Sequence, residues 1–183
     1  GALVDLQGRA SVQHQGSFTI DHTGAQVIAQ TPALQASAPF SELTVTFNED
    51  IDPATFTTSD IVSFTGSGGI DLRNQITGVT GFGRAFAVRF NAQTAASTYS
   101  LVIGPAISDL AGNAMDQNGD GAPGQASDMY IATIDVQSPD LKVTSVNVPA
   151  TARFGETVSV SYVVENVGSD PAREAWSDRI WFS

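Results

Sequence analysis

The sequence predicts an all-β fold, with about seven short strands arranged as two packed sheets. Two observations lead to this prediction. Apolar residues alternate with threonine and serine at the two-residue period of a strand that buries one face, and clusters of Gly, Pro, Asn and Asp interrupt every apolar run. Hydrophobic residues make up 42% of the 183 residues and charged residues 15%, a balance that favours a folded chain over a disordered one.

Three segments in the middle of the chain show the alternation most clearly. Each places its apolar residues on one face, namely Leu43, Val45 and Phe47, then Phe86, Val88 and Phe90, then Tyr99, Leu101 and Ile103. Further strands are expected in an opening segment that ends at Pro32 and at residues 61–65, 75–80 and 129–136. Gly81, Phe82 and Gly83 are expected to form the hairpin turn before the Phe86 strand.

A short repeat indicates how the chain is divided. Phe18 to Asp21, the end of a strand-like run that begins at Ser17, is echoed by Ala132 to Asp135, about one immunoglobulin-like domain further on. We therefore predict an immunoglobulin-like sandwich at residues 25–136, flanked by partial β domains. Residues 1–24 would be the tail of a preceding domain with its linker, and residues 137–183 the start of a following one.

The ends of the chain support the same interpretation. The chain begins without methionine or a signal-peptide pattern, so we expect an internal part of a longer protein. No apolar run approaches the roughly 20 residues of a membrane helix. Because a lone hairpin is marginal in water, we expect residues 140–183 to be exposed, poorly ordered or completed by another copy of the chain.

The charge and the rare residue types exclude several classes of function. Nineteen acidic residues against eight basic ones give a net charge of −11, which disfavours nucleic acid and anionic membrane surfaces and attracts cations. The absence of cysteine removes disulfides, thiolate zinc sites and thiol catalysis. His14 and His22 have no recognisable nucleophile motif near them. We therefore predict that the chain is not an enzyme.

The acidic stretch between Asp109 and Asp128 is the candidate site. Residues 116–121 read DQNGDG, the spacing of the first six positions of an EF-hand calcium loop, in which alternate oxygens converge and a glycine permits a sharp turn. We predict calcium binding here. The expected ligands are the side chains of Asp116, Asn118, Asp120 and Asp128 and a carbonyl near Ala122.

One departure from the EF-hand pattern keeps an alternative open. The twelfth position, where a bidentate carboxylate belongs, is Ser127, and the carboxylate of Asp128 comes one residue late. The alternative is a solvated turn in which the Asn-Gly and Asp-Gly pairs only reverse the chain. For the neighbouring segment Asp109 to Asn113 we expect a structural turn, with a positive φ at Gly112 and Leu110 anchored inward.

Two other groups of residues allow both a functional and a structural interpretation. Glu49, Asp50 and Asp52 could form a second cation site or an acid/base pair, but Pro53 beside them favours a solvated bend. Trp176 and Trp181 could stack on sugar rings, although core tryptophans of a sandwich are the favoured interpretation.

Two resemblances extend this prediction. The segments FNEDIDPATFTTSDI, TYSLVIG and ISDLAGNAM make roughly residues 26–136 resemble the bacterial Ig-like domain called Big_5 or SbsA-like, a family of S-layer and large surface proteins. Residues 140–183, with an Asn-x-Gly turn and a Trp before an Asp-Arg-aromatic strand, are similar to the opening of a CARDB domain, an adhesion-related sandwich. In such a domain Val158, Val160, Tyr162 and Val164 would form one buried face.

The resemblances imply a non-catalytic, extracellular or cell-surface module of a large bacterial protein. We expect a spacer or adhesion role with a calcium-ordered loop. The implied partners are other domains of the parent chain and a cell-surface protein or glycan. The alternatives are an accessory domain of an extracellular hydrolase and a carbohydrate-binding module.

Overall fold

The computed structural model describes residues 7, 16–17, 20–172, 177 and 179, and it confirms an all-β fold. Two four-stranded sheets form the sandwich. One has the order β1-β3-β6-β5, with β1 (Val27–Thr31), β3 (Phe40–Phe47), β6 (Ala85–Gln93) and β5 (Ile76–Phe82). The other has the order β2-β8-β7-β4, with β2 (Gln35–Ser37), β8 (Tyr130–Gln137), β7 (Ser97–Ile103) and β4 (Ile61–Thr65).

The core lies between the two sheets and contains the residues that the alternation selected. All nine residues of the three clearest segments are buried. Aromatic rings fill much of the space: Phe47 meets Phe86 edge to face with ring centroids 6.1 Å apart, and Phe40 meets Phe90 at 5.0 Å. Because each fully buried side chain of this size contributes about 1.5–3 kcal/mol of transfer free energy, this layer dominates the stability of the sandwich.

Two local features differ from the prediction. Strand β2 was not expected. It has only three residues, and backbone pairing holds it parallel to β8. The hairpin turn consists of Gly83 and Arg84 and not of the predicted residues 81–83, because β5 continues through Phe82, whose side chain is 85% exposed, and Gly83 takes the positive φ of 60°. The pairing of Phe82 with Ala85 sets this register.

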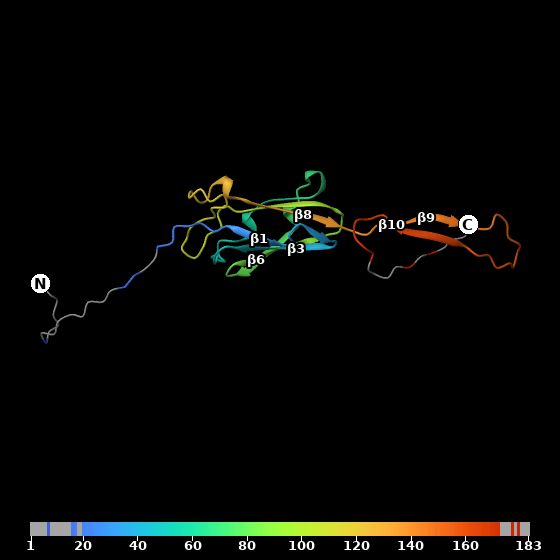
Figure 1. Ribbon diagram of the computed structural model, residues 1–183, viewed down its shortest axis with the longest axis horizontal. Coiled ribbons are helices and arrows are strands. Elements are labelled where there is room, and N and C mark those ends of the chain that lie inside the picture. The colour runs from blue at the N-terminus through green and yellow to red at the C-terminus, as the bar shows by residue number, and fades with distance from the viewer. Residues whose placement is uncertain (1–6, 8–15, 18–19, 173–176, 178, 180–183) are drawn as a thin grey trace.

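The chain enters and leaves the sandwich at opposite ends (Figure 1). The segment before β1 joins the end where the acidic loop between β7 and β8 lies, and β8 leads away at the other end into β9 (Leu141–Asn147). Of the predicted strand Ser17 to Ile20, residues 18 and 19 lie outside the described part, and Ser17 and Ile20 are not in a strand.

Strand β9 pairs with β10 (Ser161–Asn166) in an antiparallel two-stranded sheet of its own. Tyr162 and Val164 share a face of β10, as the alternation indicated, and pair with Val146 and Val143. The expectation of a buried face is wrong: Val158 and Val160 precede the strand, and none of the four predicted residues is buried. A second sheet to cover this face is not present among the described residues. Trp176 and Trp181 lie outside the described residues.

Candidate metal centre

The acidic loop is attached to the segment that opens the sandwich. The backbone N–H of Asp116 donates to the carbonyl of Ala25 at 3.1 Å, and the Gln26 side chain donates to the carbonyl of Asp116 at 2.8 Å. The Gln117 side-chain amide then accepts from Val27 N–H at 2.8 Å and donates to Val27 C=O at 3.1 Å, as a neighbouring strand would. The loop therefore occupies a defined place beside β1.

The first half of the loop is folded around Asp116. Its buried carboxylate accepts the backbone N–H of Asp120 at 3.1 Å and that of Gly121 at 2.9 Å. The Asn118 oxygen also accepts from Asp120 N–H, and the Asp120 carboxylate accepts from Ala122 N–H, each at 2.9 Å. Successive side chains thus cap successive N–H groups, and Gly121 takes the positive φ of 79° that the sharp turn requires.

The second half of the loop ends at Asp128, whose side chain is fully buried. Asp128 is the last residue of a 3-10 turn, η4 (Ala126–Asp128), and its Oδ2 accepts the backbone N–H of Gln125 at 2.8 Å. Its other oxygen, Oδ1, is buried and has no hydrogen-bond partner. A buried carboxylate oxygen without a donor is uncommon, so this atom needs an explanation in terms of a ligand or a water molecule.

The structure brings some of the predicted calcium ligands together. The Asn118 amide donates to Asp120 Oδ2 at 3.2 Å and to the Ser127 hydroxyl, next to Asp128, at 3.1 Å. The Ala122 N–H faces Asp120. Asp116 directs its carboxylate to the N–H groups of the turn. The predicted calcium site remains a prediction.

A different acidic cluster was not predicted as a unit. Within the described part of the chain, one set of three acidic residues places carboxylate oxygens within 4.8 Å of one another, and it consists of Asp21, Glu49 and Asp109. They come from three separate connections. A bridge between Ile51 and Asp109 brings two of these connections together, and the Asn113 side chain donates to the carbonyl of Asp21 at 3.3 Å. A pocket of about 380 Å³ lies over this cluster.

The electrostatics of the cluster follow from its like charges. Partial burial raises the pKa of Glu49, and the neighbouring carboxylates of Asp109 and Asp21 raise it further, against the opposing effect of Arg84. Hydrogen bonds from the Thr23 hydroxyl and N–H lower the pKa of Asp21. The surroundings of Glu49 thus disfavour its charged form.

The turn from Asp109 to Asn113 has the predicted conformation with one correction. The buried Asp109 carboxylate accepts from the backbone N–H groups of Ala111 and Asn113, each at 2.8 Å, and Gly112 has a φ of 90°. Leu110 does not anchor inward, since its side chain is 70% exposed. The carboxylate and its N–H partners hold the turn without an apolar anchor.

The predicted group Glu49, Asp50 and Asp52 is divided among different partners. Asp52 is the first residue of a bend, and its carboxylate accepts the Ala54 N–H at 3.0 Å. The Oδ1 atom of Asp50 lies 3.5 Å from Nε of Arg84. Glu49 instead joins the cluster with Asp21 and Asp109. The solvated bend that we predicted for all three residues therefore describes Asp50 and Asp52, and Glu49 departs from it.

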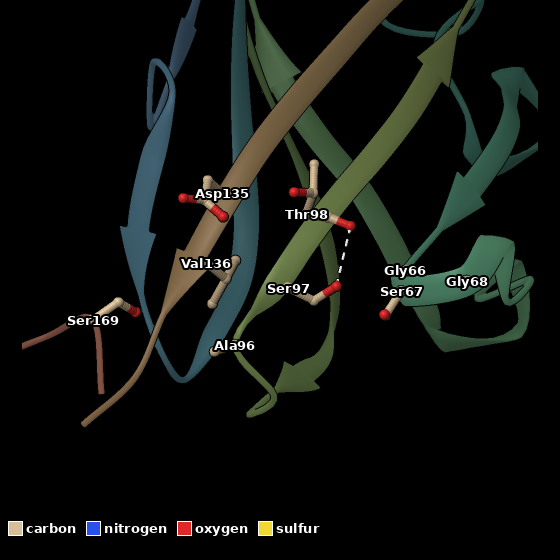
Figure 2. A pocket seen from close by; sticks show the side chains of 9 residues that line it. All are labelled: Gly66, Ser67, Gly68, Ala96, Ser97, Thr98, Asp135, Val136 and Ser169. Atoms are coloured by element: carbon tan, nitrogen blue, oxygen red, sulfur yellow. Dashed lines mark hydrogen bonds between the residues drawn. The ribbon is translucent and has the colours of Figure 1, made fainter. Parts of the chain in front are cut away.

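A second hollow lies at the exit end of the sandwich. Figure 2 shows its lining, which comes from the ends of the strands, from the Gly66–Gly68 turn and from Ser169 beyond β10. The hollow measures about 660 Å³, and Asp135 is the sole ionisable residue among the nine that line it. A single carboxylate among residues that do not ionise does not form an acid/base pair.

The arrangement of strands defines an immunoglobulin-like β-sandwich. The family model described as a bacterial Ig-like domain, Big_5, matches residues 21–121, more than half of the chain, and the chain belongs to this family. Domains of this family are generally non-catalytic. Comparison with curated proteins gives no match. Among the described residues, no helix has the length and apolar character needed to cross a membrane. The CARDB-like interpretation of residues 137–183 remains a prediction.

Proposed function

We propose that this chain is a spacer or adhesion module of a large bacterial surface or secreted protein, with its acidic loop ordered by calcium. The observation that carries the proposal is the position of the two connections, which lie at opposite ends of the sandwich (Figure 1). A domain with this geometry can be joined to others in line, so that each copy adds its own length to a string. Its partners would be the neighbouring domains and a cell-surface protein or glycan.

The family and the charge support this proposal. Bacterial Ig-like domains of this type occur in bacterial surface proteins. The net charge of −11 keeps such a module apart from anionic surfaces and draws divalent cations to its acidic loops. The exit-end hollow, with one ionisable residue in its lining, does not favour a catalytic role.

Calcium would act on the loop between β7 and β8. Its ligands would be the side chains of Asp116, Asn118, Asp120 and Asp128 with a carbonyl near Ala122. Extracellular calcium modules bind at about 10⁻⁴ to 10⁻³ M, so at millimolar calcium the added stability is on the order of 1 kcal/mol. Calcium would therefore order the loop, while the apolar core decides whether the sandwich folds.

The experiment uses two variants of the protein that contains this chain. In one, residues 21–137 are deleted, and in the other they are replaced by an unrelated β-sandwich. Deletion of the module should shorten the reach of the protein, measured by electron microscopy, and should reduce attachment to the natural surface. An unrelated β-sandwich of the same length should restore attachment if the module is a spacer. Failure of that replacement indicates that its own surface adheres. Unchanged reach and attachment after deletion would refute both roles.

The same variants separate the alternative functions. Loss of hydrolysis by the protein that contains this chain, with no change in attachment, would instead support an accessory domain of a hydrolase. Binding to a glycan array that disappears with EDTA would support a carbohydrate-binding module.

A further inference from the structure

The sandwich and the β9–β10 hairpin are joined by a short connection. Strand β8 ends at Gln137 and β9 begins at Leu141, so a linker of three residues, Ser138 to Asp140, lies between them. Neighbouring units of a chain generally move relative to each other unless a substantial set of contacts holds them. Pro139 restricts one dihedral angle of this linker. The stiffness of the joint therefore depends on what else the linker contacts.

The turn that follows β10 wraps around this linker. The carbonyl of Ser138 accepts two backbone N–H groups, that of Ser169 at 3.1 Å and that of Asp170 at 3.3 Å. The carbonyl of Asp140 accepts the N–H of Val167 at 2.7 Å. The first and the last residue of the linker are therefore both bonded to the turn.

The Asn166 side chain holds the turn and the linker together. Its Oδ1 accepts the backbone N–H of Asp140 at 2.9 Å and that of Gly168 at 3.1 Å. Its amide Nδ2 donates to the carbonyl of Asp170 at 2.8 Å. One exposed side chain thus makes three hydrogen bonds, and one of them reaches the linker. The Asn-x-Gly turn of the sequence therefore has a structural task at this joint.

Gly168 allows the turn to approach the linker closely. A Cβ at this position would collide with the backbone nitrogen of Asp140 and with the carbonyl oxygen of Ser138. The described glycines with a positive φ do not include Gly168. The lack of space beside the linker, and not an unusual backbone conformation, therefore requires a glycine here.

The same turn reaches the exit end of the sandwich. Ser169 lines the exit-end hollow together with Asp135 and other residues of the sandwich (Figure 2). Strand β8 is fixed up to its last residue, since Gln137 pairs with Ser37 of β2 and its carbonyl accepts the N–H of Ala38 at 2.8 Å. The linker is thus fixed at its sandwich end by β2 and along its length by the turn after β10.

We infer that the turn of residues 166–170 is a clasp that locks the linker and holds the hairpin in one orientation relative to the sandwich. Without these bonds, a linker of this length would let the hairpin take a wide range of angles. In a string of modules, the clasp would make each unit follow the direction of the one before it. The inference concerns the joint alone, and it stands whether the module is a spacer, an adhesive domain or an accessory domain.

The test measures distances between the two units in the whole chain by pulsed electron paramagnetic resonance. The chain contains no cysteine, so Ile131→Cys in β8 and Val163→Cys in β10, both at exposed positions, carry the two spin labels. A Gly-Ser-Gly-Ser-Gly segment inserted between Gln137 and Ser138 provides the reference for a free joint. The unaltered joint should give one narrow distance distribution, and the insertion a distribution at least about twice as wide.

The clasp itself is tested by comparing Asn166→Ala with Asn147→Ala. Asn147 is a matched control because it also ends a strand of the hairpin and is exposed, and its side chain makes no hydrogen bond within the described part of the chain. Asn166→Ala should widen the distribution about as much as the insertion, because it removes the bond to Asp140. Gly168→Ala should do the same by pushing the turn off the linker. Asn147→Ala should leave the distribution narrow.

Four results would overturn the inference. The first three are an unaltered joint as broad as the insertion reference, a narrow distribution in Asn166→Ala or Gly168→Ala, and a broad one in Asn147→Ala. Nuclear Overhauser effects between the paired residues Val143 and Val164 report whether the hairpin stays intact. The fourth result is broadening in Asn166→Ala that occurs only with loss of this pairing, since Asn166 would then hold the hairpin and not the joint.

Discussion

The sandwich and the β9–β10 hairpin share an alternating sequence pattern and differ in what covers it. In β3, Leu43 is fully buried, whereas in β9 Leu141 is 38% exposed and Val146 61% exposed. The strands of the sandwich face a second sheet, and the described part of the hairpin packs on no such layer. The comparison teaches that alternation specifies a strand with one apolar face, and that burial of the face requires a partner from elsewhere in the chain.

The hairpin is held by local polar contacts. The N–H of Asp140 donates to the Asn166 side chain at 2.9 Å, and the N–H of Val167 donates to the carbonyl of Asp140 at 2.7 Å. The pairing also shifts between Val163 and Val164. Isolated two-stranded sheets are marginally stable in water, so these contacts set the shape of the hairpin without contributing a core.

The largest expected effect comes from truncating one leucine in each region. Leu43→Ala should reduce the free energy of unfolding by about 2–5 kcal/mol, because it removes a fully buried side chain and leaves a cavity. Leu141→Ala should change it by less than about 0.5 kcal/mol. Chemical denaturation followed by fluorescence measures both. Similar losses at the two positions would show that the hairpin has a core of its own.

Two tightly packed glycines sharpen the comparison. A Cβ at Gly24 would press on the acidic loop of the sandwich, and one at Gly168 would press on Ser138 and Asp140 at the base of the hairpin. Gly24→Ala should cost about 1–3 kcal/mol in unfolding of the sandwich, the usual cost of overpacking. Gly168→Ala should leave that transition unchanged. Gly78→Ala, where a Cβ meets nothing within 4 Å, is the control for Gly24→Ala.

The acidic cluster predicts a smaller effect that depends on pH. The folded-state pKa of Glu49 is raised above its ordinary value of 4.5, so the folded protein binds more protons than the unfolded chain as pH rises through this range. Stability due to Glu49 is therefore highest below the ordinary pKa and falls as pH rises towards the folded pKa. In EDTA, Glu49→Gln should melt higher than the wild type at pH 7 and show a flatter pH profile above 4.5.

The matched variant for this test is Glu165→Gln in the hairpin, where no equivalent cluster surrounds the carboxylate in the described structure. It should leave the melting temperature of the sandwich unchanged across the same pH range. A wild type whose melting temperature rises with pH above 4.5, and whose rise is lost in Glu49→Gln, would contradict the sign of the effect.

The smallest expected effect is that of removing the hairpin region altogether. Deletion of residues 140–183 should leave the sandwich with one cooperative unfolding transition and nearly the same melting temperature, because its core lies within β1 to β8. Differential scanning calorimetry of the shortened and whole chains measures this. Loss of cooperativity would place the domain boundary beyond residue 140.

The sequence predicted most strands of the sandwich because a strand leaves a local, two-residue period. β4 coincides with the predicted residues 61–65, and β7 begins one residue earlier than expected. The Asp109 turn was predictable for a similar reason, since a carboxylate and its N–H partners lie within four residues. Strand β2 left no such signal, because three residues bound through their backbone show almost no periodicity.

The candidate sites differ in the same way, because one is formed by near neighbours in the sequence and the other by residues that are far apart in the chain. Asp116, Asn118 and Asp120 are recognisable from their spacing, and their capping bonds span two to five residues. The cluster of Asp21, Glu49 and Asp109 has no such spacing, since an isolated bridge and one Asn113 contact bring its members together. The unpartnered oxygen of Asp128 is likewise invisible in the sequence, because the burial of this side chain is set by the tertiary structure.

The sequence alone determined the all-β class, the apolar face of each long strand and the acidic loop, because side-chain direction and turn chemistry depend on near neighbours. Only the tertiary structure decided that the face of β3 is buried while that of β9 is exposed, and that Glu49 lies beside Asp21 and Asp109. Burial and electrostatic surroundings are set by segments that are distant in the chain. Their contacts arise only when the two sheets pack.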